Sequence, residues 1–485
     1  MQSESHHASG KGPGAVTGIA VAISIYLVAL VVGLPQKATA LINAGHGGDH
    51  AASHGDEHAA SDDHHSDAHD AEDHAHTSDS DDSHADGSHA SAAGKSHGDS
   101  HHAGHDEPHA APPVWTVTPF VLLLGAIAVL PLIPATEHWW ESNRNRFIVA
   151  ISLAAATLAY YGLIHSDPFS AHFPSHHTVV ENADGFNVNF VTAILGGAIL
   201  NEFIPFIVLL FSLYTISGGI RIEGDLQANP MTNALFMAAG GILASFIGTT
   251  GAAMLLIRPL LETNQARKHK VHTVLFFIFI VCNCGGCLLP IGDPPLFLGY
   301  LQGVDFFWTM GLWQEWMLCN GLLLLAYLLL DELWYYRQET ATDITRDLRN
   351  FRALKVSGLA VNGPLLLGVV AAVAFLDPSK TVGGWHPWLY FREVVQLSLV
   401  AASLVLGSKA VREANGFNYH AIQEVAALFS GIFICMQPAL QILEVNGEWL
   451  ATNYINSPMH FYWITGGLSS VLDNAPTYLV FFQTA

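Results

Sequence analysis

The sequence has few charged residues and few cysteines for its length. Only 12% of its 485 residues are charged, whereas 51% are hydrophobic. The net charge of −22 argues against a nucleic-acid partner. The five cysteines lie in or beside apolar runs, so they give no disulfide framework. Cys284 and Cys287 have CxxC spacing, but small residues at a helix break explain that spacing better than a redox or metal role.

Most of the acidity belongs to one segment. Residues 46–110 contain 16 Asp and Glu and one Lys, which accounts for −15 of the net charge, and they also contain 16 His. Such a low-complexity segment cannot bury a core, so residues 41–112 are expected to be disordered. Imidazoles with carboxylates suit zinc, copper or nickel, and a solvated tail or a pH sensor are the alternatives. Candidate Zn²⁺ ligands are His64, His65, His69, His74 and His76.

The N-terminus begins with an uncharged run at residues 15–34, followed by the small residues Ala38-Thr39-Ala40. This pattern is typical of a secretory signal peptide, but the run is long enough for an uncleaved anchor. Both alternatives for residues 1–40 place the His-rich segment outside the cytoplasm.

After residue 112, apolar runs of about twenty residues alternate with short polar stretches, which indicates an all-α polytopic membrane protein. Short cytoplasmic loops are enriched in Lys and Arg. The run 231–261 has Arg221 before it and Arg267 after it, so both of its ends are predicted to be cytoplasmic. A re-entrant hairpin that turns at the glycine and threonine residues 247–252 satisfies this pattern.

An internal repeat of opposite orientation is the second prediction. Residues 241–255 align on 466–480, and Glu202 and Glu424 each stand near the start of an apolar run. The first repeat covers about 200–336, and the second covers about 422–485 and is expected to be cut short. Inverted repeats with broken helices are typical of secondary transporters, which are not enzymes.

The polar residues at the predicted breaks are candidate ligands of a transported ion. An ionised Asp near the bilayer centre costs about 3 kcal/mol or more, so it is retained with a cation, a proton or a partner. Asp473 is the candidate carboxylate that Na⁺ and H⁺ would share. The candidate oxygen ligands around it and at the first break are Ser470, Asn474, Thr477, Thr249, Thr250 and Asn283.

Three further groups have competing interpretations. Asp293 is either a second acid of the site or a helix cap before Pro294. Arg258 is either a charge partner or anion ligand, or a snorkelling interfacial residue. Interfacial positions rather than transport roles are expected for Glu202, Glu424, His272 and His420.

The chain resembles the ion transporter superfamily, and within it the membrane proteins described as sodium:proton antiporters or citrate transporters. The resemblance covers residues 113–485 and rests on IGTTGA at 247–252 with MLLIRP at 254–259, on NCGGCLLPIGDPPLF at 283–297, and on DNAPT at 473–477. It implies an α-helical transporter, often a homodimer, that binds Na⁺ at paired helix breaks. Relatives commonly carry Thr before the proline of the glycine-rich segment, where this chain has Leu289.

The leading hypothesis from the sequence is a Na⁺/H⁺ antiporter of the inner membrane, without a cofactor and surrounded by lipid. A sodium- or proton-coupled symporter of citrate, another carboxylate or a metal–citrate complex is the first alternative. A metal-binding or sensing membrane protein that works through its histidines is the second.

Overall fold

The computed structural model describes residues 12–40, 111–339 without 172, 175, 176, 183 and 184, 352–470 without 379 and 381–383, and 474–482. The chain divides into two units, and one of them is Met1–Gly47 together with His109–Ala485. The other unit, Gly48–Pro108, lies outside the described residues, and so do the five candidate zinc-binding histidines.

Helices dominate the described part of the chain, as the apolar runs predict. Seven helices are long and apolar enough to cross a membrane, and a bent pair adds an eighth if it forms one span. The seven are Ala15–Val32, Val114–Leu132, Asn143–Leu163, Val188–Ser217, Pro230–Ile247, Val271–Leu288 and Trp308–Gln338, and the pair, bent by 43°, is His420–Cys435 with Gln437–Gly447. The protein is therefore an all-α polytopic membrane protein.

The elements of the first half are α1 (Gly12–Val32), η1 (Val114–Val117), α3 (Thr118–Val129), η2 (Leu130–Leu132), α4 (Glu137–Trp140), α5 (Asn143–Leu163), β1 (Phe169–Ala171), β2 (His177–Val179), α6 (Val188–Leu195), the π-helical η3 (Gly196–Phe203), α7 (Ile204–Ser217), β3 (Arg221–Asp225), α8 (Pro230–Ile247) and α9 (Thr249–Thr263). Strands β1 and β2 pair antiparallel. The apolar run 188–218 predicts a membrane crossing, best fitted by residues 203–218; in the structure α6, η3 and α7 form one continuous span, Val188–Ser217.

The elements of the second half are α10 (Val271–Phe277), the π-helical η4 (Ile278–Asn283), η5 (Cys284–Leu288), α11 (Pro294–Leu301), η6 (Trp308–Leu312), α12 (Trp313–Leu330), the π-helical η7 (Asp331–Tyr335), η8 (Tyr336–Gln338), β4 (Arg352–Ser357), α14 (Leu359–Phe375), α15 (Phe391–Leu406), α16 (Lys409–Ala414), α17 (His420–Cys435), α18 (Gln437–Asn453), α19 (Pro458–Ser469) and α20 (Asn474–Phe482). Strand β4 pairs antiparallel with β3.

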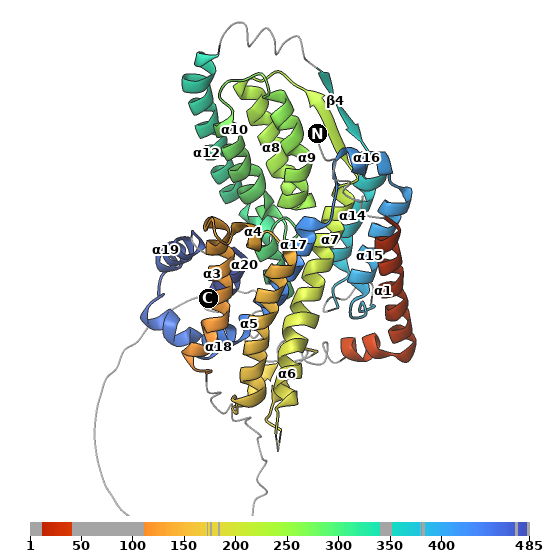
Figure 1. The fold of residues 1–485 in the computed structure, drawn as a ribbon, viewed down its shortest axis with the longest axis vertical. Helices are drawn as coiled ribbons and strands as arrows, with labels where there is room; N and C mark the ends of the chain where they lie inside the picture. The colour runs from red at the N-terminus through yellow and green to blue at the C-terminus, as the bar shows by residue number, and fades with distance from the viewer. Residues whose placement is uncertain are drawn as a thin grey trace, which may run out of the picture. The chain divides into compact units, whose positions relative to one another are not determined.

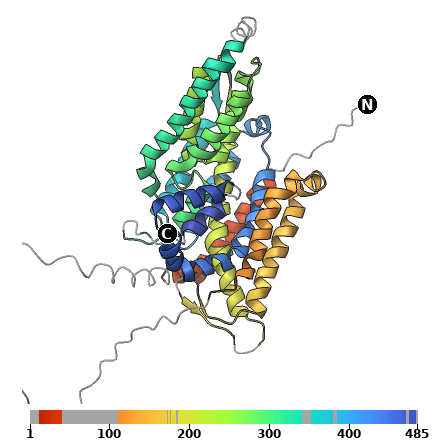
Figure 2. The same ribbon diagram turned by 90° about the vertical axis from the view of Figure 1, so that its left-hand side faces the viewer.

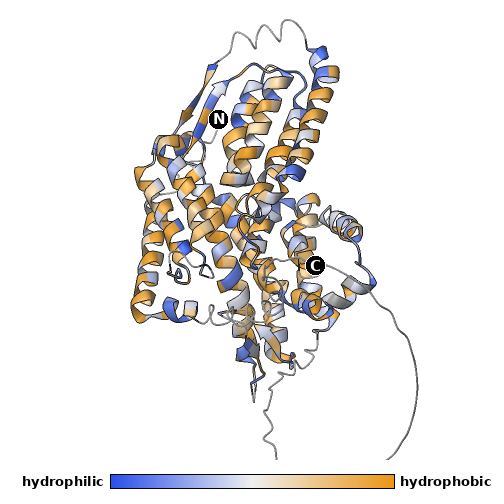
Figure 3. Ribbon diagram, turned by 180° about the vertical axis from the view of Figure 1, so that it is seen from behind, coloured by the Kyte–Doolittle hydropathy of each residue, from blue (hydrophilic) through white to orange (hydrophobic). Residues whose placement is uncertain are grey.

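Helix α12 shows why these surfaces belong in lipid. Each of five large apolar side chains on it exposes more than half of its surface: Met317, Leu318, Leu322, Leu325 and Leu329. Water would make so large an exposed apolar surface unfavourable, whereas hydrocarbon would not. Figure 3 shows hydrophobic residues along the helices and hydrophilic residues gathered on the β3–β4 strands.

Helices α7 and α17 run in opposite directions. Phe206, near the start of α7, stacks on Phe429 in the later part of α17, with ring centroids 4.8 Å apart. The Tyr214 hydroxyl, near the end of α7, donates a hydrogen bond to the Asn418 carbonyl just before α17. Figure 2 shows α5 beside α17, and the carboxamide of Asn143 donates to the His420 carbonyl where both helices begin.

The run 231–261 forms a hairpin that turns at Gly248, between α8 and α9. Asn233 near the start of α8 and Asn264 just after α9 exchange two side-chain hydrogen bonds, of 2.8 and 2.9 Å. Both side chains are buried. Two residues 31 positions apart meet while the turn lies halfway between them, so the two ends of the hairpin lie together. Figure 1 shows α8, α9, α10 and α12 side by side.

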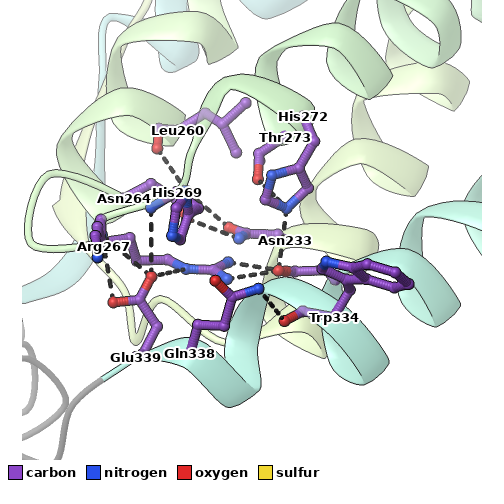
Figure 4. A network of polar contacts seen from close by, with 12 residues as sticks. Asn233, Leu260, Asn264, Arg267, His269, His272, Thr273, Trp334, Gln338 and Glu339 are labelled. Atoms are coloured by element: carbon purple, nitrogen blue, oxygen red, sulfur yellow. Dashed lines mark hydrogen bonds and ion pairs between the residues drawn. The ribbon is translucent and has the colours of Figure 1, made fainter.

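A buried ion pair fixes these hairpin ends to α12. Arg267 donates two hydrogen bonds to Asp331, at 2.8 and 2.5 Å, and both side chains are enclosed. Burial opposes the charge of Arg267, but the hydrogen bonds and Coulomb attraction from Asp331 outweigh it and raise the pKa of the guanidinium. Figure 4 shows Arg267 directed toward this contact, with His272 and Glu339 beside it. Removing one partner of such a pair is costly, because the remaining charge stays buried.

The paired asparagines predict a specific stability effect. We expect Asn264→Ala to lower the free energy of unfolding by about 1–3 kcal/mol, because the buried amide of Asn233 loses its partner. The measurement is the apparent melting temperature of the purified protein in detergent. The double variant, with Asn233→Ala added, should lose less stability than the two single variants together.

The matched control is Gln338→Ala, at the same end of the molecule (Figure 4). Its side chain is exposed and donates to the Trp334 carbonyl. We expect it to change stability by no more than about 0.5 kcal/mol. Equal losses in Asn264→Ala and Gln338→Ala would contradict the paired-asparagine account of the hairpin ends.

Candidate functional site: two helix breaks that meet inside the protein

The first break is a turn at Gly248, between the two helices of the hairpin. Gly248 has φ 78° and ψ 150°, a conformation that is essentially restricted to glycine. The turn ends α8 and starts α9, and the Ala252 amide returns a 3.0 Å hydrogen bond to the Gly248 carbonyl. Glycine is therefore required here to reverse the chain within one residue.

The second break runs from Asn283 to Asp293, between η4 and α11. It meets the first break through a 3.0 Å hydrogen bond from the Thr249 amide to the Gly292 carbonyl. A methyl group added at Gly292 would overlap the Gly286 carbonyl, and one added at Gly285 would lie 2.7 Å from the Gly241 Cα. The backbones touch directly, which only glycine permits.

Side chains from neighbouring helices satisfy the polar backbone groups of this second break. The Ser245 hydroxyl on α8 donates to the Gly285 carbonyl at 2.6 Å and accepts from the Leu288 amide at 3.2 Å. Trp316 on α12 also donates to the Gly285 carbonyl, and Thr309 donates to the Leu288 carbonyl. Unpaired backbone groups cost several kcal/mol each in a membrane, so these bonds hold the break in place.

A small cavity of about 50 Å³ lies where the two breaks meet. A water molecule needs roughly 10–15 Å³ of such volume, so the cavity has room for a few water-sized groups. Its walls come from α7, α17 and both breaks, and they include Thr249, Thr250, Gly248, Ile291, Gly292, Pro294, Leu210, Leu213, Tyr214, Ile422 and Val425.

Two of the sequence-predicted ligands line this cavity. Thr249 is 8% exposed, and Thr250 is an exposed residue beside it. Each hydroxyl has lone pairs that suit a hard cation such as Na⁺. Helices α9 and α11 both begin at the cavity, where α8 ends. The N-terminus of α9 carries partial positive charge.

The two other ligands predicted at these breaks, Asn283 and Asp293, are not among the residues that line the cavity. Asn283 is exposed. Asp293 occupies the N-cap position of α11, but its side chain makes no capping hydrogen bond to that helix. It is half-buried, next to the cavity-lining Pro294.

Arg258 lies away from the breaks, in the second half of α9. Its guanidinium donates a 3.0 Å hydrogen bond to the Ala414 carbonyl at the end of α16, and Arg221 binds the same carbonyl. Its side chain is exposed. In this structure the positive charge of Arg258 therefore stabilises a helix C-terminus and does not face the cavity.

Helix α20, within the segment predicted as the second repeat, packs against α11 directly after the second break. A methyl group at Gly299 of α11 would collide with the Tyr478 hydroxyl of α20, and Thr477 is 2% exposed. Asn474 accepts a 2.8 Å hydrogen bond from Ser469, and Ser470 donates to the Gly467 carbonyl. Asp473 lies outside the described residues.

The interfacial position expected for Glu202 is wrong. Glu202 lies inside the continuous span Val188–Ser217 and is 6% exposed. An apolar α6 precedes it, and the sequence pattern did not join this helix to the crossing that follows. The role of Ser245 was also missed, although its alignment with Ser470 in the internal repeat was the available signal.

Residues 109–485 match a protein family described as "Putative citrate transport". The chain belongs to this family. No curated protein and no solved structure matches it. Membership of a citrate-transport family and the apolar spans together identify the chain as a multi-pass membrane transport protein, and both helix breaks lie within the matched residues.

The glycine contact within the second break gives a direct prediction. We expect Gly292→Ala to lower the stability by about 1–3 kcal/mol, because the added methyl group overlaps the Gly286 carbonyl of the same break. Transport should fall with it, since the cavity lies at the same contact. The melting temperature in detergent and transport in proteoliposomes measure the two effects.

Gly321→Ala is the matched control, because nothing lies within 4 Å of the added methyl group. Helix α12 should gain roughly 0.5–1 kcal/mol from this change. The glycine-contact account would be wrong if Gly292→Ala were as stable and as active as Gly321→Ala.

Proposed function

We propose that the protein is a secondary active transporter that exchanges Na⁺ for H⁺ across the cell membrane. The observation that carries the proposal is the small cavity at the meeting of two helix breaks, with Thr249 and Thr250 among the residues that line it. Paired broken helices near the middle of the membrane are the usual ion sites of such transporters. Family membership supports transport as the general activity.

The size of the cavity favours an ion over a large organic substrate. About 50 Å³ is enough for a cation with one or two waters, whereas a tricarboxylate has thirteen heavy atoms and needs more room. A tricarboxylate also needs positive side chains to balance its charge. Arg258, the basic residue of the hairpin helices, binds the Ala414 carbonyl instead.

Asp473 is the proposed carboxylate that Na⁺ and H⁺ share. In the sequence it directly precedes Asn474, the first residue of α20, and the predicted break of the second repeat lies at this point. An acid at such a position is stabilised by a bound cation or a proton, and the two compete. Thr249, Thr250, Asn474 and Thr477 are the proposed neutral ligands, and access alternates between the two sides of the membrane.

Citrate or another carboxylate is a second candidate, which two observations favour. The family description names citrate, and the N-terminus of α9 borders the cavity. Helix N-termini hold carboxylates without basic side chains. A conformation with a wider cavity would be required for this cargo.

The test is transport by the full chain in proteoliposomes. A Na⁺ gradient should drive proton movement, read with a pH-sensitive dye, and labelled citrate should not accumulate. Asp473→Asn should reduce Na⁺-driven proton movement by more than about tenfold, because an amide cannot exchange a proton in this range. Asp305→Asn is the control, since this exposed carboxylate binds Lys380 away from the breaks.

Thr249→Val tests the ligand role of the cavity wall. It keeps the side-chain shape and removes the hydroxyl, so we expect the Na⁺ concentration for half-maximal exchange to rise by about tenfold. Thr249→Ser should stay near the wild type. Citrate uptake by the wild type, or Na⁺/H⁺ exchange that survives in Asp473→Asn, would contradict the proposed mechanism.

A further inference from the structure

Glu202 is a buried carboxyl group outside the cavity described above. It lies in the π-helical segment η3, inside the span Val188–Ser217. Its Oε1 accepts a 3.0 Å hydrogen bond from the carboxamide of Gln302. Its Oε2 is enclosed and has no hydrogen-bond partner among the described residues. A carboxyl oxygen left in this state needs an explanation, because buried polar atoms are normally satisfied.

The elements packed against η3 supply no opposite charge. Helices α6, α7 and α11 contain no charged residue. Helix α17 contains Glu424 and His420 in its first turns, and Glu424 binds Arg146 there, whereas the aromatic ring of Phe433 packs against Phe203 near Glu202. A negative charge on Glu202 would be uncompensated in these surroundings, so the carboxyl is best accommodated with a proton on it.

The described residues at the start of α15 also offer Glu202 no unpaired positive charge. Tyr390, just before α15, donates a 2.7 Å hydrogen bond to the Leu200 carbonyl of η3. Arg392, the next charged residue, binds Glu393 at 2.7 Å and Asp377 at 3.3 Å. Arg392 is therefore already paired with two carboxylates and leaves no unpaired positive charge for Glu202.

The position of Glu202 connects it to both walls of the cavity. It lies eight residues before Leu210, which lines the cavity from α7. Gln302 follows the last residue of α11, and α11 begins at the cavity with Pro294. The hydrogen bond from Gln302 to Glu202 thus joins the helix after the second break to the helix on the opposite wall. The π-helical form of η3 fits this role, because such segments occur frequently at functional sites.

We propose that Glu202 is a proton-carrying residue of the transport cycle, in addition to Asp473. Its carboxyl binds a proton when the site is free of Na⁺ and releases it as Na⁺ arrives and the α11 contact rearranges. The step is a simple proton transfer, with the carboxylic acid giving a carboxylate and a proton. The inference rests on the proposed Na⁺/H⁺ exchange and names a second group that couples it to protons.

Two transport modes of the full chain in proteoliposomes test this role separately. Exchange of labelled Na⁺ against unlabelled Na⁺ needs no proton, whereas Na⁺-driven acidification or alkalinisation does. We expect Glu202→Gln to keep Na⁺/Na⁺ exchange within about twofold of the wild type and to lose proton coupling by more than about tenfold. The amide has nearly the same shape and still bonds to Gln302, so folding should be unaffected.

Two control variants distinguish proton carriage from a structural role. Glu424→Gln changes the aligned glutamate, which has Arg146 as its partner, and should keep proton coupling. Gln302→Leu removes the hydrogen bond but leaves the carboxyl, so it should keep proton coupling with an altered pH profile. A role limited to the Gln302 hydrogen bond predicts the opposite, with loss of proton coupling in Gln302→Leu and wild-type coupling in Glu202→Gln, which keeps that bond.

The outcomes separate this inference from the proposed function. Proton coupling at the wild-type rate in Glu202→Gln overturns the role of Glu202 and leaves Na⁺/H⁺ exchange standing. Loss of both modes in a Glu202→Gln protein with an unchanged melting temperature also overturns it, because Glu202 would then be needed for Na⁺ movement itself. Absence of Na⁺ exchange in the wild type overturns the proposed function, and this inference with it.

Discussion

A membrane-spanning backbone cannot leave its amide and carbonyl groups without partners, and this constraint shapes the site more than any single side chain does. The two breaks between α8 and α11 satisfy their backbone groups by packing on each other. Gly286 packs against Thr249 of the first break, Gly292 packs against Gly286, and Ser245 serves one carbonyl and one amide of the second break at once. Thr249 and Thr250, which line the cavity, each carry a hydroxyl group.

The ends of the hairpin are held more firmly than its turn. Asn233 with Asn264 and Arg267 with Asp331 are buried pairs at one end, where the strands β3 and β4 also pair. At the turn, the contacts are one backbone hydrogen bond, glycine packing and a small cavity. A transporter that alternates access needs this distribution, with a fixed frame and a site whose walls can move. Helix α11 is the connecting element, because it starts at the cavity, packs on α20 and ends at the hydrogen bond to Glu202.

The sequence predicted the features that depend on local patterns. Apolar run length predicted an α-helical membrane protein, the flanking Arg and Lys residues predicted a hairpin, and the glycine–threonine cluster predicted its turn near residue 248. Features that depend on packing between distant segments could not be predicted from the sequence. Nothing local shows that Asn283 does not line the cavity, that Arg258 reaches Ala414, or that α6, η3 and α7 form one continuous span around Glu202. A helix that begins at an apolar residue and continues through a π-helical segment has no clear boundary in the sequence, so Glu202 looked like the start of a crossing.

The sidedness of the hairpin is the most direct test of this account. Single cysteines in place of Gln227 and Gln265, which flank α8 and α9, would be introduced into a variant without the five native cysteines. A membrane-impermeant maleimide is then applied to intact cells and to everted vesicles. The account predicts that both positions react in everted vesicles and that neither reacts in intact cells, because the hairpin enters and leaves by the cytoplasmic face. Labelling of the two positions from opposite sides would show that the run crosses the membrane fully and would contradict the account.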